Sequence, residues 1–309
     1  MKTTKFPTTP RRGAAIAAAA IAAIAIAATF ATQNASAAVS VRDDDGNLIT
    51  LQKPALRIVA MAPHVTELLF AAGGGDKIVG AVSYSDFPEA AKKIPRIGSN
   101  RQIDMERVIA LKPDLIVAWM HGSSERQIET LRQLGIPIFH SEPLKLDGIP
   151  DSLLRLGQLM GTESVAQPAA ADIRKQFAAL AKQYSNRPPV RMFYQVWDKP
   201  LYTLNGVSIV SDAMRLCGGV NIFADLKATA PVVSVEAVLQ ADPEAIFGTA
   251  EKDYGGVTLW KPYATMKAVR NDNLFTLDGE LLNRAGPRMV AGTTALCEKL
   301  ELARQHRKN

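Results

Sequence analysis

The segment IDMERVIALKPDLIV, residues 103–117, decides the fold, because a second segment repeats its pattern 130 residues later. The second segment is VSVEAVLQADPEAIF, residues 233–247. Glu106 matches Glu236, Pro113 matches Pro243, and the apolar positions coincide. Each segment predicts a short helix followed by a buried strand. The shared register of glutamate, proline and apolar residues indicates two similar α/β lobes.

Strands and helices alternate on both sides of this repeat. In the first half we predict strands at 57–61, 78–82, 115–119 and 136–140 and helices at 64–72, 105–111 and 124–134. In the second half we predict strands at 190–196, 245–249 and 274–277 and helices at 208–217, 235–239 and 287–306. This alternation is typical of an α/β fold with mostly parallel sheets covered by helices on both faces.

An alanine-rich stretch between the two halves predicts one long helix at 169–184. Ile173, Phe177, Leu180 and Tyr184 recur at three- and four-residue spacing, with Pro168 near the start. One backbone helix of this length would join the lobes stiffly and leave a cleft between them. The predicted organisation is a signal peptide at 1–37, an N-terminal lobe at 38–160, a linking helix at 161–189 and a C-terminal lobe at 190–309.

The first 37 residues have the three-part layout of a secretory signal peptide. Basic residues come first, an alanine-rich apolar run follows from Gly13 to Phe30, and Ala35-Ser36-Ala37 forms a small-x-small cleavage pattern. A transmembrane anchor is the alternative, but the run is weakly apolar. Arg11-Arg12 permits a twin-arginine signal, although the residues after it favour the general export route. We therefore predict a periplasmic protein exported by a cleavable signal.

Most of the positive net charge lies in this segment and is lost when the segment is removed. The whole chain carries a formal net charge of +6, and the first 37 residues contribute four basic residues and no acid. Cleavage leaves a net charge of +2, without a basic stripe. This excludes nucleic acid as a partner.

The chain has two cysteines, Cys217 and Cys297. An even pair in an exported protein favours a disulfide, which would attach the last helix to its own lobe. Two separate buried thiols are the alternative.

The sequence contains no motif of a known class of enzyme. The nucleophile elbow, the P-loop, the dinucleotide-binding glycine pattern and the zinc-protease helix motif are all missing. We predict a protein that is not an enzyme, and an exported α/β hydrolase is the remote alternative. The four histidines are scattered, so neither a cofactor nor a metal site is expected. His64 is a metal ligand only if haem or a metal is the cargo, and otherwise an ordinary loop histidine.

Four aromatic residues follow predicted strands. Tyr84 lies in the loop after 78–82, Trp119 ends the strand 115–119, and Trp197 and Tyr202 flank the loop after 190–196. The carboxyl ends of parallel strands form the ligand crevice of open α/β sheets. Flat apolar rings there favour a large planar ligand, whereas any single ring could equally be core.

Glu106 and Glu236 occupy equivalent places in the repeat, each at the start of a short helix. A single such acid is commonly a favourable charge at a helix N-terminus. A symmetric pair, one on each lobe, instead favours a shared partner surface with arginines.

The sequence resembles the helical-backbone class of periplasmic substrate-binding proteins of ABC importers, and within it the cobalamin-binding branch. The resemblance extends from Arg57 to about Leu302. The segments that carry it are TELLFAAG at 66–73, YSDFP at 84–88, ERVIALKPDLIVAW at 106–119, ERQ at 125–127, CGGVNIF at 217–223 and RAGPR at 284–288.

The resemblance implies a role for several residues. Tyr84 would contact the corrin, and Trp119 and Tyr202 match pocket aromatics. Glu106 and Glu236 match acids that dock onto arginines of the membrane permease, and Cys217 and Cys297 match a disulfide pair. A ligand-contacting loop of the second lobe corresponds to Glu280, Leu281, Leu282, Asn283 and Arg284.

This chain departs from the family pattern at the pocket. Asn100 and Ala230 stand where the family has tryptophan, and Val196 stands where it has phenylalanine, next to Trp197. The family's acid-aromatic-aromatic-acid-Arg loop is here ELLNR, residues 280–284. The resemblance implies a monomeric receptor that captures cobalamin or another corrinoid and delivers it to an inner-membrane permease with its ATPase subunits. Haem or a ferric siderophore is the alternative ligand.

Overall fold

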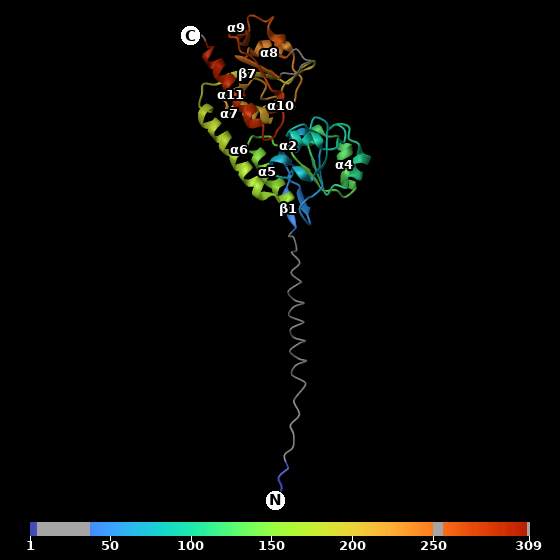
Figure 1. Cartoon of the computed structure of the whole chain (residues 1–309). Coiled ribbons are helices and arrows are strands. Elements are labelled where there is room, and N and C mark those ends of the chain that lie inside the picture. The colour runs from blue at the N-terminus through green and yellow to red at the C-terminus, as the bar shows by residue number, and fades with distance from the viewer. Residues whose placement is uncertain (5–37, 250–255, 308–309) are drawn as a thin grey trace. The chain divides into compact units, whose positions relative to one another are not determined.

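Two parallel sheets form the framework of the protein in this computed structural model, which describes residues 1–4, 38–249 and 256–307 (Figure 1). The predicted signal peptide falls on residues 5–37, outside the described residues. Among the residues that the structure describes, no helix is both long and apolar enough to cross a membrane.

The N-terminal sheet has the strand order β4-β3-β5-β6, all parallel. Its strands are β3 (Ile58–Ala60), β4 (Ile78–Ala81), β5 (Leu115–Ala118) and β6 (Ile138–His140). Every residue of β3, β5 and β6 is buried, as expected for strands covered on both faces. The helices of this half are α2 (Pro63–Ala71), α3 (Met105–Ala110), α4 (Glu125–Gln133) and α5 (Gly148–Met160).

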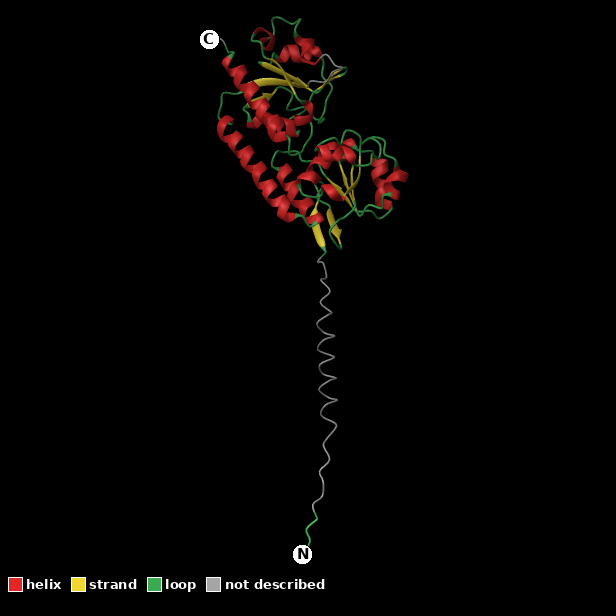
Figure 2. Ribbon diagram, viewed as in Figure 1, coloured by secondary structure: helices red, strands yellow, loops and turns green. Residues whose placement is uncertain are grey.

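The C-terminal sheet has the order β10-β7-β11-β12 and is also parallel. Its strands are β7 (Val190–Gln195), β10 (Gly219–Asn221), β11 (Ala245–Thr249) and β12 (Leu274–Leu277). The helices are α7 (Ile209–Leu216), α8 (Val235–Ala241), α9 (Lys267–Arg270), α10 (Gly279–Leu282) and α11 (Met289–Gln305). Figure 2 shows helices flanking each group of strands, so the prediction of an α/β fold with two similar lobes is confirmed.

The sequence repeat has the same geometry in both lobes. Asp104 caps α3 by accepting the backbone N–H of Arg107, and Ser234 caps α8 by accepting that of Ala237. The residues before the two prolines, Lys112 and Asp242, both have a positive φ, of 48° and 43°. Each short helix therefore turns sharply into a central strand, β5 or β11, which explains the repeat.

Helix α6 (Glu163–Tyr184) runs along both sheets in Figure 1. It begins earlier than the predicted start at 169, so Pro168 lies inside it rather than at its edge. Its buried residues Ile173 and Phe177 belong to one apolar cluster that contains residues of both sheets. Helix α5, which the sequence analysis missed, packs beside α6. The two helices approach so closely that a Cβ on Gly157 of α5 would lie 2.4 Å from the Cβ of Ala166. The two lobes thus share a continuous core.

Two small antiparallel ribbons complete the structure. The sequence analysis did not predict the first, β1 (Val39–Arg42) paired with β2 (Leu48–Leu51). The second pairs β8 (Trp197–Asp198) with β9 (Leu201–Tyr202), directly after β7.

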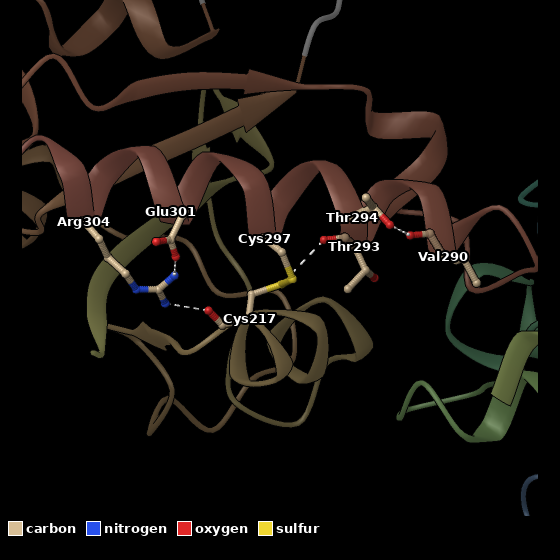
Figure 3. Close-up of a disulfide and its surroundings, with 7 residues drawn as sticks. All are labelled: Cys217, Val290, Thr293, Thr294, Cys297, Glu301 and Arg304. Carbon is tan, nitrogen blue, oxygen red and sulfur yellow. Dashed lines mark hydrogen bonds and ion pairs between the residues drawn. A yellow bond between two sulfur atoms is a disulfide. The ribbon is translucent and has the colours of Figure 1, made fainter. Parts of the chain in front are cut away.

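Cys217 and Cys297 form a disulfide, as the sequence predicts (Figure 3). It joins the end of α7 to the middle of α11, and both cysteines are fully buried. Arg304, on the same helix, donates a hydrogen bond to the carbonyl of Cys217 at 2.7 Å. The bridge closes a loop across 80 residues, a length for which the loss of unfolded-state entropy stabilises the fold by about 4 kcal/mol.

Candidate functional site

A cavity of about 960 Å³ lies where the carboxyl ends of the two sheets face each other. Trp119 comes directly after β5, and Val196 directly after β7. His64, at the start of α2, also lines the cavity. Open α/β sheets bind ligands at this end of their strands. The volume is at the upper end of the range for small-molecule sites, which suits a large ligand.

Three aromatic side chains line the cavity, namely Trp119, Trp197 and Tyr202. Trp197 and Tyr202 are directly paired across the β8–β9 ribbon, so a single element presents both rings. A Cβ on Gly122 would lie only 1.9 Å from the Trp119 ring. Glycine at this position therefore permits the observed orientation of the tryptophan. The rings come from both lobes and offer flat apolar surfaces.

His64 is a buried, neutral side chain of the cavity wall. Its pKa is lowered to about 4, mainly by burial; a hydrogen bond with the backbone of Ser141 opposes the shift, and the charge of Arg284 adds to it. Its ring stands edge to face with Trp119, with the centroids 5.6 Å apart. Nε2 has no hydrogen-bond partner among the described residues. The imidazole thus offers an unprotonated nitrogen beside the cavity.

The polar rim of the cavity contains a histidine–carboxylate pair. His121 Nδ1 lies 2.6 Å from Glu142 Oε2, and both residues line the cavity together with Arg101. Asn283 lies on the opposite lobe, where its Oδ1 accepts a hydrogen bond from the Tyr194 hydroxyl at 2.8 Å. The cavity therefore combines an apolar lining with a few fixed polar groups.

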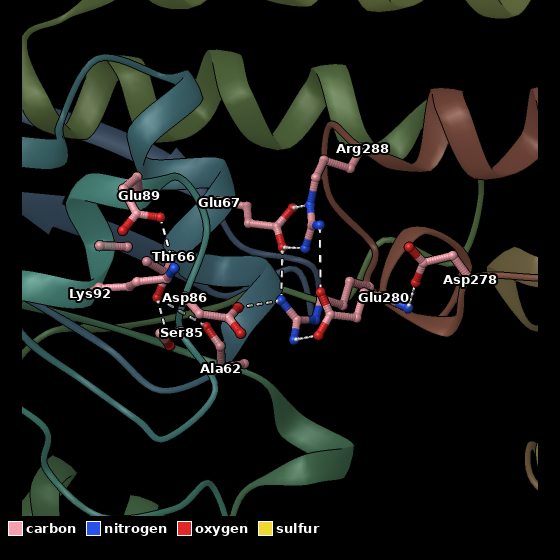
Figure 4. Close-up of polar contacts among 12 residues, drawn as sticks. Ala62, Thr66, Glu67, Ser85, Asp86, Glu89, Lys92, Asp278, Glu280 and Arg288 are labelled. Carbon is pink, nitrogen blue, oxygen red and sulfur yellow. Dashed lines mark hydrogen bonds and ion pairs between the residues drawn. The ribbon is translucent and has the colours of Figure 1, made fainter. Parts of the chain in front are cut away.

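A charged cluster joins the two lobes beside this cavity (Figure 4). We call it the inter-lobe cluster, and it consists of Glu67, Asp86, Glu280, Arg284 and Arg288. Glu67, on α2, is only 3 % exposed. Arg288 donates two hydrogen bonds to its carboxylate, at 3.0 and 2.7 Å. This parallel two-bond geometry is the strongest arginine–carboxylate arrangement.

The second arginine connects the remaining acids of the cluster. Arg284 lies 3.3 Å from Glu67, 3.0 Å from Asp86 and 3.3 Å from Glu280. Burial alone would raise the pKa of Asp86, but the hydrogen bond and charge of Arg284 hold it below its usual value. Arg288 also lies over the Phe87 ring, 4.3 Å from its centroid. The cluster crosses from one lobe to the other.

The structure divides the predicted ligand residues into three groups. Trp119, Trp197, Tyr202 and Asn283 line the cavity. Glu280 and Arg284 belong to the inter-lobe cluster, and neither lines the cavity. Tyr84 is 77 % exposed and lies outside the lining, as do Leu281 and Leu282.

The sequence analysis did not single out some of the lining residues. Arg101, His121, Glu142 and Leu204 line the cavity. Val196 and Ala230, two of the departures from the family pattern, line it too. His121 and Glu142 follow β5 and β6, so their position at strand ends was the available signal.

Glu106 and Glu236 are both exposed and occupy the second position of α3 and α8. Neither forms an ion pair with another residue that the structure describes. The pKa of Glu236 is lowered because its carboxylate accepts hydrogen bonds from its own backbone N–H and from the Ser234 hydroxyl. Each lobe therefore presents to solvent a carboxylate that has no ion-pair partner among the described residues.

Comparison with known proteins identifies a family for nearly the whole fold. Residues 58–281 match the family described as periplasmic binding protein. The chain is 39 % identical over 260 residues to a vitamin B12-binding protein of Vibrio cholerae serotype O1, covering 84 % of this chain and 94 % of that one. It is 37 % identical over 257 residues to the vitamin B12-binding protein of Yersinia pestis, covering 82 % and 90 %.

Solved structures give the same result. The periplasmic vitamin B12 binding protein BtuF of Vibrio cholerae superposes with a TM-score of 0.76 at 39 % identity, covering 82 % of this chain and 99 % of that one. The periplasmic heme-binding protein RhuT from Roseiflexus sp. RS-1 superposes with a TM-score of 0.69 at 25 % identity, covering 80 % and 98 %.

The pairing of Glu67 yields a prediction on stability. The substitution Glu67→Gln removes a buried carboxylate and leaves Arg288 and Arg284 without their central partner, so we expect a loss of about 3 kcal/mol in the free energy of unfolding. Denaturant titration measures it. The matched control is Glu89→Gln, which breaks an exposed ion pair with Lys92 and should cost less than about 1 kcal/mol. Equal losses in both variants would contradict the role of the cluster.

The pKa of His64 yields a prediction on pH dependence. The folded pKa of about 4 lies below the ordinary 6.5, so the unfolded state takes up the proton first as the pH falls. The neutral, buried His64 therefore favours the folded state fully above pH 6.5, and this contribution to the free energy of unfolding decreases as the pH falls towards 4. Between pH 7.5 and 4.5 the wild type should lose about 2 to 3 kcal/mol that His64→Gln does not lose. Denaturation of both proteins at the two pH values measures this, and parallel losses would refute it.

Proposed function

The chain belongs to the periplasmic binding protein family, and we propose that it captures cobalamin or a related corrinoid in the cavity between its two lobes. The observation that carries this proposal is the cavity itself. Its rings come from both lobes, so a flat ligand between them would contact Trp119 on one side and the Trp197–Tyr202 pair on the other. The similarity to vitamin B12-binding proteins over most of the chain supports the choice of ligand.

We propose that the captured ligand is delivered to an inner-membrane ABC permease with its ATPase subunits. The free carboxylates of Glu106 and Glu236 would pair with arginines of the permease. They occupy equivalent helices in the two lobes, so one symmetric partner could contact both at once. Movement of the permease would then pull the lobes apart against the inter-lobe cluster and release the ligand.

The protein would act by binding alone, and no bond would be made or broken. The hydroxyl of Ser208, which lines the cavity, donates to the carbonyl of Asn205 at 3.1 Å and lies 3.2 Å from the Ser211 hydroxyl. It is therefore engaged with its own loop rather than with a histidine base, which weighs against the hydrolase alternative.

We also propose export to the periplasm through cleavage after Ala37. The first strand of the structure, β1, begins at Val39. Cleavage at that point would leave every strand and helix of the two lobes intact.

Haem or a ferric siderophore is the second candidate ligand, and two observations favour it. His64 has an unprotonated Nε2 without a partner among the described residues, next to the cavity. RhuT, a relative at 25 % identity, is a heme-binding protein. Haem binding through His64 would give a Soret band that changes in His64→Ala but not in the exposed-ring variant Tyr84→Phe.

Titration with cobalamin tests the proposed ligand. We expect binding at or below micromolar concentration, and Trp119→Ala should weaken it about tenfold, because a ring contact is lost. The matched control Trp119→Phe keeps a ring and should retain most of the affinity. Calorimetry measures both. If cobalamin and cobinamide fail to bind while haem binds, the corrinoid proposal is wrong and the second candidate takes its place.

Charge reversal tests the docking surface. The double variant Glu106→Arg, Glu236→Arg should bind the ligand with unchanged affinity but fail to stimulate ATP hydrolysis by the reconstituted importer, because both carboxylates then repel the arginines. Glu125→Arg is the control, since Glu125 is an exposed acid in the first turn of another helix of the same lobe. Normal stimulation by the double variant would disprove docking through these residues.

A further inference from the structure

A second cluster of ligating side chains lies away from the cavity, where the β1–β2 hairpin meets the end of β6. The turn between β1 and β2 contains Asp43, Asp44 and Asp45 in succession. The backbone N–H of Asp44 donates to the carbonyl of His140, the last residue of β6, at 3.0 Å. One possible ligand atom from each of Asp43, Asp45 and His140 can be chosen so that the three atoms lie within 4.8 Å of one another.

The negative charge in this turn is only partly compensated. Asp44 forms an ion pair with Arg155 at 2.5 Å and accepts the backbone N–H of Glu142. Asp43 is 4 % exposed, and its Oδ1 accepts two backbone N–H groups of its own turn. Among the described residues, neither Asp43 nor Asp45 forms an ion pair with an arginine or a lysine. The Oδ2 of Asp43 also accepts hydrogen bonds from the Asn47 side chain at 3.3 Å and the His140 backbone N–H at 3.4 Å, so this carboxylate is hydrogen-bonded but has no arginine or lysine partner among the described residues.

His140 is the group that faces both carboxylates. Its side chain is 3 % exposed, and Nδ1 lies 2.5 Å from Asp45 and 3.9 Å from Asp43. The other ring nitrogen, Nε2, is buried without a hydrogen-bond partner among the described residues. Nδ1 thus faces both carboxylates, and one divalent cation placed there would contact all three side chains.

The geometry points to a divalent transition-metal site formed by Asp43, Asp45 and His140, for which zinc is the best fit. Ligands of a tetrahedral zinc lie about 2.0–2.2 Å from the ion and hence about 3.3 Å apart. The distance from Nδ1 to Asp45 would lengthen, and that to Asp43 would shorten. Three protein ligands with an imidazole among them suit zinc better than calcium or magnesium. Asp45 is exposed, so water can complete the coordination.

The role of this ion would be to fasten the hairpin to the N-terminal sheet. None of the three residues lines the cavity, so the inference is independent of the ligand that the cavity binds. The ion would join residues that are 95 positions apart in the chain. Binding to the folded state alone would raise the thermal stability of the protein.

Titration of the purified protein, without a polyhistidine tag, with Zn²⁺ tests this site. We expect one equivalent to bind and the melting temperature to rise. Asp45→Asn, a change at the exposed ligand, should weaken zinc binding at least tenfold, and His140→Gln should abolish it. Co²⁺ in place of zinc should give the intense visible bands of a tetrahedral site in the wild type, and these bands should be lost in Asp45→Asn.

The control is His121→Gln. It removes the His121–Glu142 pair, the other place among the described residues where a histidine nitrogen lies less than 3 Å from a carboxylate oxygen. Zinc affinity should be unchanged in this variant. Absence of zinc binding at 100 μM would overturn the proposal, because a dissociation constant on the order of 100 μM or weaker is that of a weak surface site. So would binding that survives Asp45→Asn but is lost in His121→Gln, because the ion would then lie at the His121–Glu142 pair.

Discussion

The pairing of one buried carboxylate, Glu67, with two arginines of the other lobe is the interaction on which the arrangement of the site depends. A carboxylate that is only 3 % exposed must be paired, and Arg284 and Arg288 supply its partners from the far side of the cavity. Moving the lobes apart would leave the buried Glu67 carboxylate without both arginines, whereas Arg284 and Arg288 would keep Glu280 of their own lobe. The distance between the aromatic walls is therefore set by electrostatics as well as by the backbone.

The second constraint is the continuous core along α6. Its buried face packs with residues of both sheets, and the small residues Gly157 and Ala166 let α5 approach it closely. One helix that is part of both cores cannot bend without losing apolar contacts. The lobes are therefore expected to move little on their own, and a partner that separates them would have to supply the free energy of opening.

The sequence predicted those features that depend on local pattern, and it missed those that depend on distant partners. The repeat, the parallel sheets and the rings at strand ends follow from periodicity and from the topology of α/β sheets. The hairpin was missed although Asp45-Gly46 is a typical turn signal between alternating residues. Glu67 looked like an ordinary helical residue, because its partners lie more than 200 positions away.

The same long-range pairing explains why Arg284, a ligand residue by resemblance, does not line the cavity. Three carboxylates hold it, and Arg288 is held by two of them. The charged lining that remains is Arg101 and the His121–Glu142 pair. Haem carries two propionates and needs basic side chains, whereas the amide side chains of a corrinoid need only neutral hydrogen-bonding groups. Two arginines near the cavity, Arg284 and Arg288, are committed to the inter-lobe cluster, and Arg101 is the arginine that lines the cavity among the described residues, which limits the pairing that two propionates would find.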